Sequence, residues 1–363
     1  MLRLSLMPVR VGVVGLGGVA DRIHLPACAA VPGLAIAAAA DPNSQTRQTM
    51  AEKFGIRETY TGYEELLEKA KPDFIIVGTP PGSHFEICRH ALEAGVHVFC
   101  EKPFMASVDE ASKIVELARR KNLLLRVNNQ YRFMSYYAET KRRLEQGQFG
   151  RPFYIQGWQQ MFHPPAKETN WRSGLKQYLL FEFGTHALDL ACFFFDALPQ
   201  SVNVFTPRVR PEFDADILVS ATLRFPEERL ATFSFNRVSH APEKYLEMRI
   251  DCEKASLRIS LGGVARVSID WAKNSRRFYV KHGFVRGGQA RAEVNGVPHT
   301  YCNSANPEFA AATAEHLKLF LKQMELPLRP IDAAEQARDV LNLVFAGYES
   351  AETGETVRLQ KPE

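Results

Sequence analysis

Residues 11–20 join an apolar strand to a glycine-rich turn, and they constrain the fold more than any other stretch. They read Val-Gly-Val-Val-Gly-Leu-Gly-Gly-Val-Ala and lead into a helical segment, after which a second apolar run ends at Asp41. Gly15 permits a tight turn, Gly17 lets the backbone approach a pyrophosphate, and the small Ala20 lets the helix pack close to the strand. A carboxylate at Asp41 can accept hydrogen bonds from an adenosine ribose. This order predicts a dinucleotide site; the alternative is a tight strand-to-helix turn with no ligand.

The acid at the end of the second strand also predicts the form of the cofactor. Asp41 repels a 2′-phosphate, and Pro42 and Asn43 follow it in place of an arginine. Arg47 lies a turn or two into the next helix, which we expect to be too far away. We therefore expect NAD(H) rather than NADP(H). The residues expected to hold it in this region are Gly15, Gly17, Gly18, Val19, Ala20 and Asp41.

Length, cysteine usage and charge exclude several classes of protein. At 363 residues the chain is long enough for two domains, which we place at 1–126 and 127–363. The six cysteines form no Cys-x-x-Cys pair, which favours a reducing compartment and argues against a structural zinc, so no metal is expected. A net charge of +4 without a basic block argues against nucleic acid. No apolar run approaches the ~20 residues of a membrane span, and residues 1–10 lack a signal-peptide core. We therefore expect a cytoplasmic protein with no membrane partner.

Two patterns of secondary structure follow one another along the chain. In the first third, apolar strands at 9–15, 34–40, 74–78, 96–100 and 123–128 alternate with helices that include 63–70, 83–94 and 108–121. This predicts an α/β fold with a doubly wound, parallel Rossmann sheet whose ligand lies at the carboxyl ends of the strands. After a helix at 136–145, strand-length segments from 151 to 271 follow without a long helix between most of them. We expect an α+β domain with a large, open, mostly antiparallel sheet, closed by a helix that Asn306 caps and by another at 332–350.

Lys102 stands just after the fourth apolar strand, at the sheet edge shared with Gly15 and Thr79. A hydride transfer needs a base for the hydroxyl proton and a donor or cation near the reacting oxygen. Lys102 can supply the cation beside a nicotinamide, and Glu101 can accept from its ribose. The alternative is a lysine in a surface loop.

The segment Phe181-Glu-Phe-Gly-Thr-His-Ala-Leu-Asp-Leu190 carries the second group of candidates. On a regular helix Glu182, His186 and Asp189 share one face, because they are spaced by four and three residues. A histidine beside a carboxylate suits general base work near neutral pH. The alternative is a buried structural cluster in which the acids satisfy His186 or Arg172.

Five motifs in this order closely resemble the Gfo/Idh/MocA family (glucose–fructose oxidoreductase, inositol dehydrogenase and relatives). They are Gly15-Leu-Gly-Gly-Val-Ala20, Ala40-Asp41-Pro42, Thr79-Pro-Pro-Gly-Ser-His84, Glu101-Lys102-Pro103 and Glu182-x-Gly184-x-His186-x-x-Asp189. The resemblance implies NAD(P)-dependent oxidoreduction of sugars, cyclitols or related polyols, and a homodimer or homotetramer built through the open sheet. By position, Lys102 would orient substrate and nicotinamide, and His186 would act as acid and base. Cofactor contacts are further expected from Thr79, Pro80, His84, Glu101 and Lys102.

The chain departs from the family pattern in its second half. Glu182 stands where the family usually has Asp, and the extra methylene can move the carboxylate by about 1 Å. Gln177-Tyr-Leu-Leu180 replaces a glycine run that many relatives place just before this acid. Trp171 and Arg172 precede the site and are expected to line it with Lys102, Glu182 and His186; for Arg172 an ion pair with Glu182 is the alternative.

The function expected from the sequence is hydride transfer between nicotinamide and a hydroxyl or ketone of a small, sugar-like substrate. His186 would take the hydroxyl proton while Lys102 and Glu182 hold the oxygen. Two alternatives stay open. One is an NAD-retaining glycoside hydrolase that uses transient oxidation and elimination, and the other is a catalytically silent ligand-binding member of the family.

Overall fold

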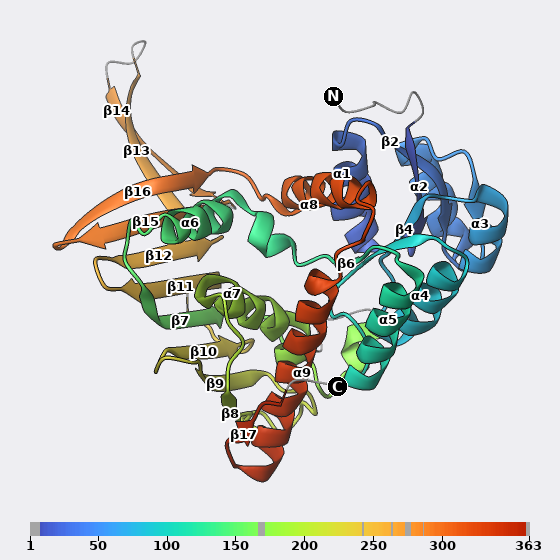
Figure 1. Cartoon of the computed structure of the whole chain (residues 1–363). Coiled ribbons are helices and arrows are strands. Elements are labelled where there is room, and N and C mark those ends of the chain that lie inside the picture. The colour runs from blue at the N-terminus through green and yellow to red at the C-terminus, as the bar shows by residue number, and fades with distance from the viewer. Residues whose placement is uncertain are drawn as a thin grey trace. The chain divides into compact units, whose positions relative to one another are not determined.

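In the computed structural model the chain forms two compact units (Figure 1). Unit 1 comprises residues 1–133 and 309–344, with 361–363, and unit 2 comprises 134–308 and 345–360. The structure describes residues 8–165, 171–241, 243–262, 264–272, 277–285 and 287–360, with side chains left out from 263 to 286. The domain boundary between residues 126 and 127 stays a prediction.

Unit 1 contains the parallel sheet that the sequence predicts. Its six strands lie in the order β3-β2-β1-β4-β5-β6, and every neighbouring pair is parallel. In this order the chain leaves β1 to one side and later returns to its other side, so the switch point lies between β1 and β4, where doubly wound sheets bind ligands. The strands are β1 (Val9–Val14), β2 (Leu34–Ala40), β3 (Thr59–Tyr60), β4 (Phe74–Val77), β5 (His97–Cys100) and β6 (Leu125–Val127).

Helices cover both faces of this sheet. On one face Val11, Phe74 and Phe99 pack in one apolar core with Leu317 and Phe320 of α8, and α8 lies against α1 (Figure 1). This is a return of the distant chain that local sequence patterns do not reveal. The helices are α1 (Leu25–Ala30), α2 (Ser44–Phe54), α3 (Tyr63–Ala70), α4 (His84–Glu93), α5 (Val108–Lys121) and α8 (Phe309–Met324).

Two details of the helices differ from expectation. A π-helical turn, η1 (Ala20–His24), interrupts the helix that follows the glycine turn and precedes α1. Helix α8 begins at Phe309, so Asn306 lies too far before it to be its N-cap.

Unit 2 is built on a nine-stranded sheet in the order β16-β15-β12-β11-β7-β10-β9-β8-β17. All neighbouring pairs are antiparallel except β7 and β10, which run parallel, so the mostly antiparallel sheet is confirmed. A separate hairpin pairs β13 with β14. The strands are β7 (Pro152–Gln160), β8 (Ser201–Phe205), β9 (Leu218–Arg224), β10 (Leu230–Asn236), β11 (Lys244–Cys252), β12 (Ser256–Leu261), β13 (Val264–Ala272), β14 (Arg277–Val285), β15 (Gly288–Val294), β16 (Val297–Ser304) and β17 (Val357–Arg358).

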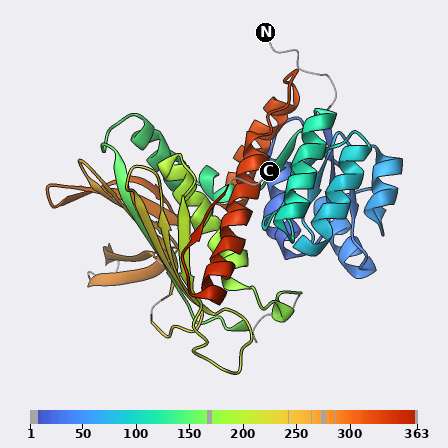
Figure 2. The same cartoon turned by 60° about the horizontal axis from the view of Figure 1, so that its bottom comes forward.

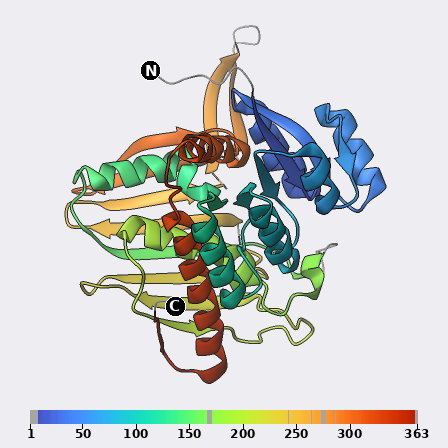
Figure 3. The ribbon, with the colours of Figure 1, turned by 45° about the vertical axis from the view of Figure 1, so that its right-hand side comes forward.

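Helices α6 (Ser135–Glu145) and α7 (Thr185–Phe195) lie along one face of this sheet (Figures 2 and 3). The strands alternate buried and exposed residues, as β9 does, because only the face under these helices is covered. Helix α9 (Asp332–Thr353) contributes its first residues to unit 1 and its last turns to unit 2. None of the described helices is long and apolar enough to cross a membrane.

Candidate functional site

The glycine turn after β1 leaves open space where a ligand can approach the backbone. Gly15 has φ +88°, and a Cβ there would lie 2.9 Å from the carbonyl of Gly78, so this glycine is required by the turn itself. A Cβ on Gly17 would meet nothing within 4 Å, and on Gly18 it would meet only the end of the Arg22 side chain. Packing within the protein therefore explains Gly15 but does not explain Gly17.

The helix after this turn presents its amino end at the same place. It begins at Gly18, and the first main-chain bond runs from the amide of Asp21 to the carbonyl of Gly17, so the N–H groups of Gly18, Val19 and Ala20 precede the helical bonding pattern. Gly17 and Gly18 are exposed, whereas Ala20 is fully buried and lets the helix lie against the sheet. Exposed N–H groups at a helix start suit a phosphate.

Asp41 connects the end of β2 to the glycine turn. Its Oδ2 accepts a hydrogen bond from the amide of Leu16 at 2.8 Å, and its Oδ1 accepts one from the amide of Asn43 at 2.9 Å. The guanidinium of Arg47 donates to the main-chain oxygen of Asp41 at 2.6 Å. Arg47, in the first turn of α2, therefore reaches the main chain at the end of β2, and the expectation that it is too far away to hold a 2′-phosphate stays a prediction.

The side chain of His84, which is fully buried, contacts the main chain of the turn after β4. The ring nitrogens of His84 lie 2.8 Å from the carbonyl oxygen of Thr79 and 2.9 Å from that of Phe104. Burial lowers the pKa of His84, although the two carbonyls act in the opposite direction. Thr79 is half-buried and Pro80 is exposed, so these two residues, rather than the imidazole, are the accessible part of the turn.

Glu101 and Lys102 follow β5, at the sheet edge that the sequence predicts. Lys102 is partly exposed and precedes Pro103 through a cis peptide bond. Glu101 is 5% exposed, and its Oε1 accepts from the amide side chain of Asn128 at 2.7 Å and lies 3.0 Å from Nε2 of His24. Burial alone would raise the pKa of Glu101, but His24, Asn128 and the nearby Lys102 outweigh it and lower the pKa.

His24 and Asn128 are residues that the sequence reasoning missed. The signal for His24 was present, because a histidine between Ile23 and Leu25 in an apolar stretch is costly to bury without a polar partner. Nothing in the local sequence pairs Asn128 with Glu101, since the two are brought together only by the neighbouring ends of β5 and β6.

In unit 2, Glu182, His186 and Asp189 are all buried. Glu182 lies in a second π-helical turn, η6 (Leu180–Gly184), and the other two residues lie in α7. The sequence analysis expects one regular helix here, on which Glu182 and His186 would share a face. The π turn departs from that regular geometry, so the argument from a four-residue spacing does not apply across it.

The ion pair that the sequence left as an alternative for Arg172 is present. Its Nε lies 2.7 Å from Oε2 of Glu182, and its guanidinium lies 4.6 Å from the centre of the Trp171 ring. Trp171 and Arg172 are partly exposed while Glu182 is buried, so a cation lies between this carboxylate and the surface of the unit.

Asp216 is a further residue that sequence reasoning missed. Its carboxylate accepts hydrogen bonds from the amides of Tyr178, Leu179 and Leu180, and from the hydroxyl of Tyr348. These amides begin the helical segment that carries Glu182 and His186, so a carboxylate distant in sequence caps it. Burial raises the pKa of Asp216, and the donors act against it.

The structure thus groups the candidate residues within two separate units. Residues 15–20, Asp41, Thr79, Pro80 and Lys102 lie at one edge of the parallel sheet in unit 1. Trp171, Arg172, Glu182 and His186 lie near the start of α7 in unit 2. Within the described part of the chain no group of three His, Cys, Asp or Glu side chains is arranged to hold a metal ion.

Two family models match the chain. Residues 9–129 match the model of an oxidoreductase family with an NAD-binding Rossmann fold, and residues 137–258 match a GFO/IDH/MocA C-terminal domain.

Individual proteins are also similar. The dTDP-3,4-didehydro-2,6-dideoxy-alpha-D-glucose 3-reductase of Saccharopolyspora spinosa is 30% identical over 66% of this chain and 71% of its own length. The D-glucoside 3-dehydrogenase of Escherichia coli strain K12 is 26% identical over 97% of this chain and 98% of its own. The crystal structure of myo-inositol 2-dehydrogenase from Lactobacillus plantarum matches the fold with a TM-score of 0.80 and 19% identity, over 97% of this chain and all of that one.

Proposed function

Because this chain belongs to the Gfo/Idh/MocA family of oxidoreductases with an NAD-binding Rossmann fold, we propose that it transfers a hydride between NAD and a carbon–oxygen centre of a sugar or cyclitol. The observation that carries the proposal is the open space at Gly17. A Cβ there would contact nothing within 4 Å, so packing within the protein does not require a glycine at this position. Curated relatives that act on a glucoside and on a nucleotide-linked deoxysugar support the substrate class.

The residues present at the sheet edge fit a dinucleotide. Gly17, Gly18 and the amides that follow them would hold the pyrophosphate, and Asp41 would accept from the adenosine ribose, with Thr79 and Pro80 beside the cofactor. Bound nicotinamide would supply the hydride acceptor or donor. The Asp41 carboxylate is fixed by the amides of Leu16 and Asn43, so its negative charge stays where a 2′-phosphate would lie, which favours NAD over NADP.

The chain's own residues would divide the remaining work. Lys102 would orient the substrate oxygen by its positive charge, and His186 would take the hydroxyl proton in oxidation and return it in reduction. Glu182 would hold the substrate hydroxyl with the Arg172 guanidinium limiting its movement, because the two groups are in contact at 2.7 Å. Trp171 would offer an apolar face to the sugar ring.

A pair of glycine variants tests cofactor binding. Gly17→Ala adds a Cβ that meets nothing in the protein, so it should leave thermal stability unchanged and weaken NAD binding by about tenfold or more. Gly15→Ala should lower stability, because it strains a positive φ and contacts Gly78. Equal NAD affinity in wild type and Gly17→Ala would contradict the proposed cradle.

A panel of polyols, sugars and ketoses, followed by nicotinamide absorbance with NAD and NADP in parallel, tests the reaction. Turnover that is lost in both Lys102→Ala and His186→Ala supports the assigned roles. Glycosidase activity without net release of reduced cofactor would instead support the hydrolase alternative, and NAD binding without any turnover would support a silent binding protein.

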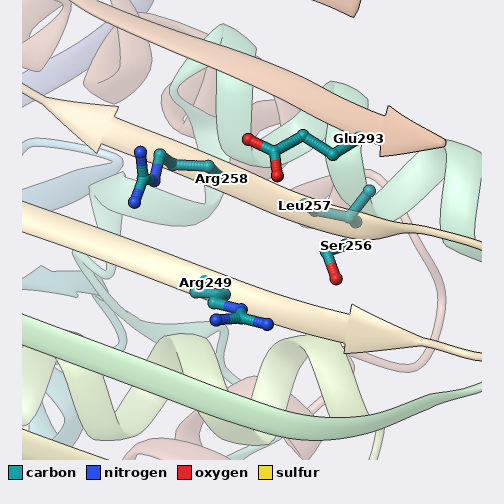
Figure 4. Close-up of a pocket in the computed structure, with 5 residues that line it drawn as sticks. All are labelled: Arg249, Ser256, Leu257, Arg258 and Glu293. Carbon is teal, nitrogen blue, oxygen red and sulfur yellow. The ribbon is translucent and has the colours of Figure 1, made fainter. Parts of the chain in front are cut away.

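We further propose that two or four copies assemble through the uncovered face of the nine-stranded sheet, in the cytoplasm. This face presents Arg249, Arg258 and Glu293 around a depression of about 100 Å³ (Figure 4). The depression is smaller than the roughly 300 Å³ at which small-molecule sites begin, so the face suits a protein surface better than a sugar. Sedimentation tests this: a monomer at micromolar concentration would contradict the assembly, and Arg258→Glu should weaken a dimer or tetramer.

A further inference from the structure

The imidazole of His24 is a fully buried polar group that the proposed reaction does not use. It is 0% exposed, its Nε2 lies 3.0 Å from Oε1 of Glu101, and its ring meets Phe99 edge-on with centroids 6.5 Å apart. Neither ring nitrogen makes a hydrogen bond of regular geometry among the described residues, so the approach of Nε2 to Glu101 is a close polar contact rather than an aligned hydrogen bond. A fully buried imidazole is costly, and its one close polar contact is the carboxylate of Glu101.

Glu101 also contacts the main chain of the next residue, Lys102. Its Oε2 accepts a hydrogen bond from the amide of Lys102 at 3.1 Å. Its Oε1 accepts one from the side chain of Asn128 and lies 3.0 Å from Nε2 of His24. Asn128 in turn lies within hydrogen-bond distance of Thr313 on α8. The carboxylate therefore ties together the helix after the glycine turn, the ends of β5 and β6, and α8.

The local helix geometry supports a specific placement of the imidazole. His24 ends the π turn η1, and Glu182 lies within the other π turn of the described chain, η6. π turns are rare and occur frequently at functional sites, because the extra residue rotates the side chains that follow it. The same helix thus begins at the proposed pyrophosphate cradle and, one π turn later, contacts the carboxylate beside Lys102.

We propose that His24 is a positioning residue: it fixes the carboxylate of Glu101, which fixes the main chain from which the Lys102 ammonium extends. The inference rests on the proposed function only for the use of that ammonium in catalysis. A displacement of about 1 Å in a reacting group can lower turnover by about a hundredfold. His24 itself touches neither cofactor nor substrate in this scheme.

Three variants separate positioning from general stability. His24→Leu removes the imidazole, and His24→Gln keeps an N–H donor at a similar reach toward Glu101. His97→Leu is the matched control, because His97 lies at the opposite end of β5, where its Nδ1 accepts from the amide of Leu124 at 2.8 Å. Each variant is compared with wild type by hydrogen exchange at the Lys102 amide, by NAD affinity and by kcat.

We expect His24→Leu to speed exchange at the Lys102 amide by about tenfold and to lower kcat by roughly 30- to 100-fold, with NAD affinity within about threefold of wild type. His24→Gln should restore both properties, and His97→Leu should change neither. Unchanged exchange in His24→Leu overturns the proposal, as does unchanged kcat despite faster exchange, or an equal effect in His97→Leu. A wild type that binds NAD but turns over no substrate refutes the proposed function, while the exchange measurement still decides whether His24 fixes Lys102.

Discussion

Asp216→Ala should destabilise unit 2 more than most single substitutions, because one carboxylate caps the helical segment that carries Glu182 and His186. The substitution leaves three main-chain amides and the hydroxyl of Tyr348 without this acceptor. A single capping side chain contributes about 1 kcal/mol, and a buried donor left without a partner costs about 1–3 kcal/mol. Contributions of groups that share one acceptor do not add, so we expect a total loss of about 2–4 kcal/mol.

The assay is equilibrium urea unfolding followed by circular dichroism, with kcat measured on the same preparations. Asp214→Ala is the matched control, because Asp214 lies in the same loop and pairs with Arg208 through two largely exposed side chains. It should have no measurable effect on unfolding. The cap lies at the start of the helical segment that runs through η6 into α7, so Asp216→Ala should also lower kcat in the absence of urea. A loss of stability under about 1 kcal/mol, or equal losses in both variants, would refute the capping argument.

Three further predictions follow. Asp41→Asn should narrow the preference for NAD over NADP by roughly tenfold in kcat/KM, because a fixed negative charge no longer opposes the 2′-phosphate; an unchanged ratio would show that Asp41 does not face the ribose. The pKa of Glu101 is lowered, so its carboxylate stabilises the fold above pH 4.5 and this contribution is lost as the pH falls through the folded pKa. Wild type should therefore lose more of its unfolding free energy than Glu101→Gln below pH 4.5, and parallel urea titration curves would contradict this. Arg172→Met should destabilise the protein by roughly 1–3 kcal/mol, because it leaves the buried Glu182 without that cation. Adding Glu182→Gln should recover most of the loss, and additive losses in the double variant would show that the pair is not coupled.

Much of unit 1 could be predicted because its signals are local. Helices α3 and α5 have the predicted bounds, and apolar runs mark β1, β2, β4 and β5 to within a residue or two. The sequence analysis assigned Gly15 to the tight turn. The structure gives the reason, because Gly15 has a positive φ and a Cβ there would contact the main chain of Gly78. In unit 2 the sequence analysis predicts most strands but misses β14, β15, β16 and β17. Strand β15 alternates, but its buried positions hold only Gly and Ala instead of the β-branched and aromatic residues that favour strands.

The candidate site could be predicted from the sequence only in part, because some of its contacts join residues that are far apart in the chain. Local spacing predicts that Glu182 and His186 belong to one helical segment, but it does not predict the π turn or the remote cap supplied by Asp216. The roles assigned to Lys102 and His186 stay predictions.

By itself, the order of residues determined the glycine turn, the parallel strands and the position of Lys102 after β5, because each depends on backbone preferences and apolar runs of neighbouring residues. Tertiary structure alone decided that α8 packs on the first sheet, and that Glu101 meets both His24 and Asn128. Such contacts join segments 27 to about 300 residues apart, and they form only where the strand ends and helices are packed together, so no local pattern encodes them.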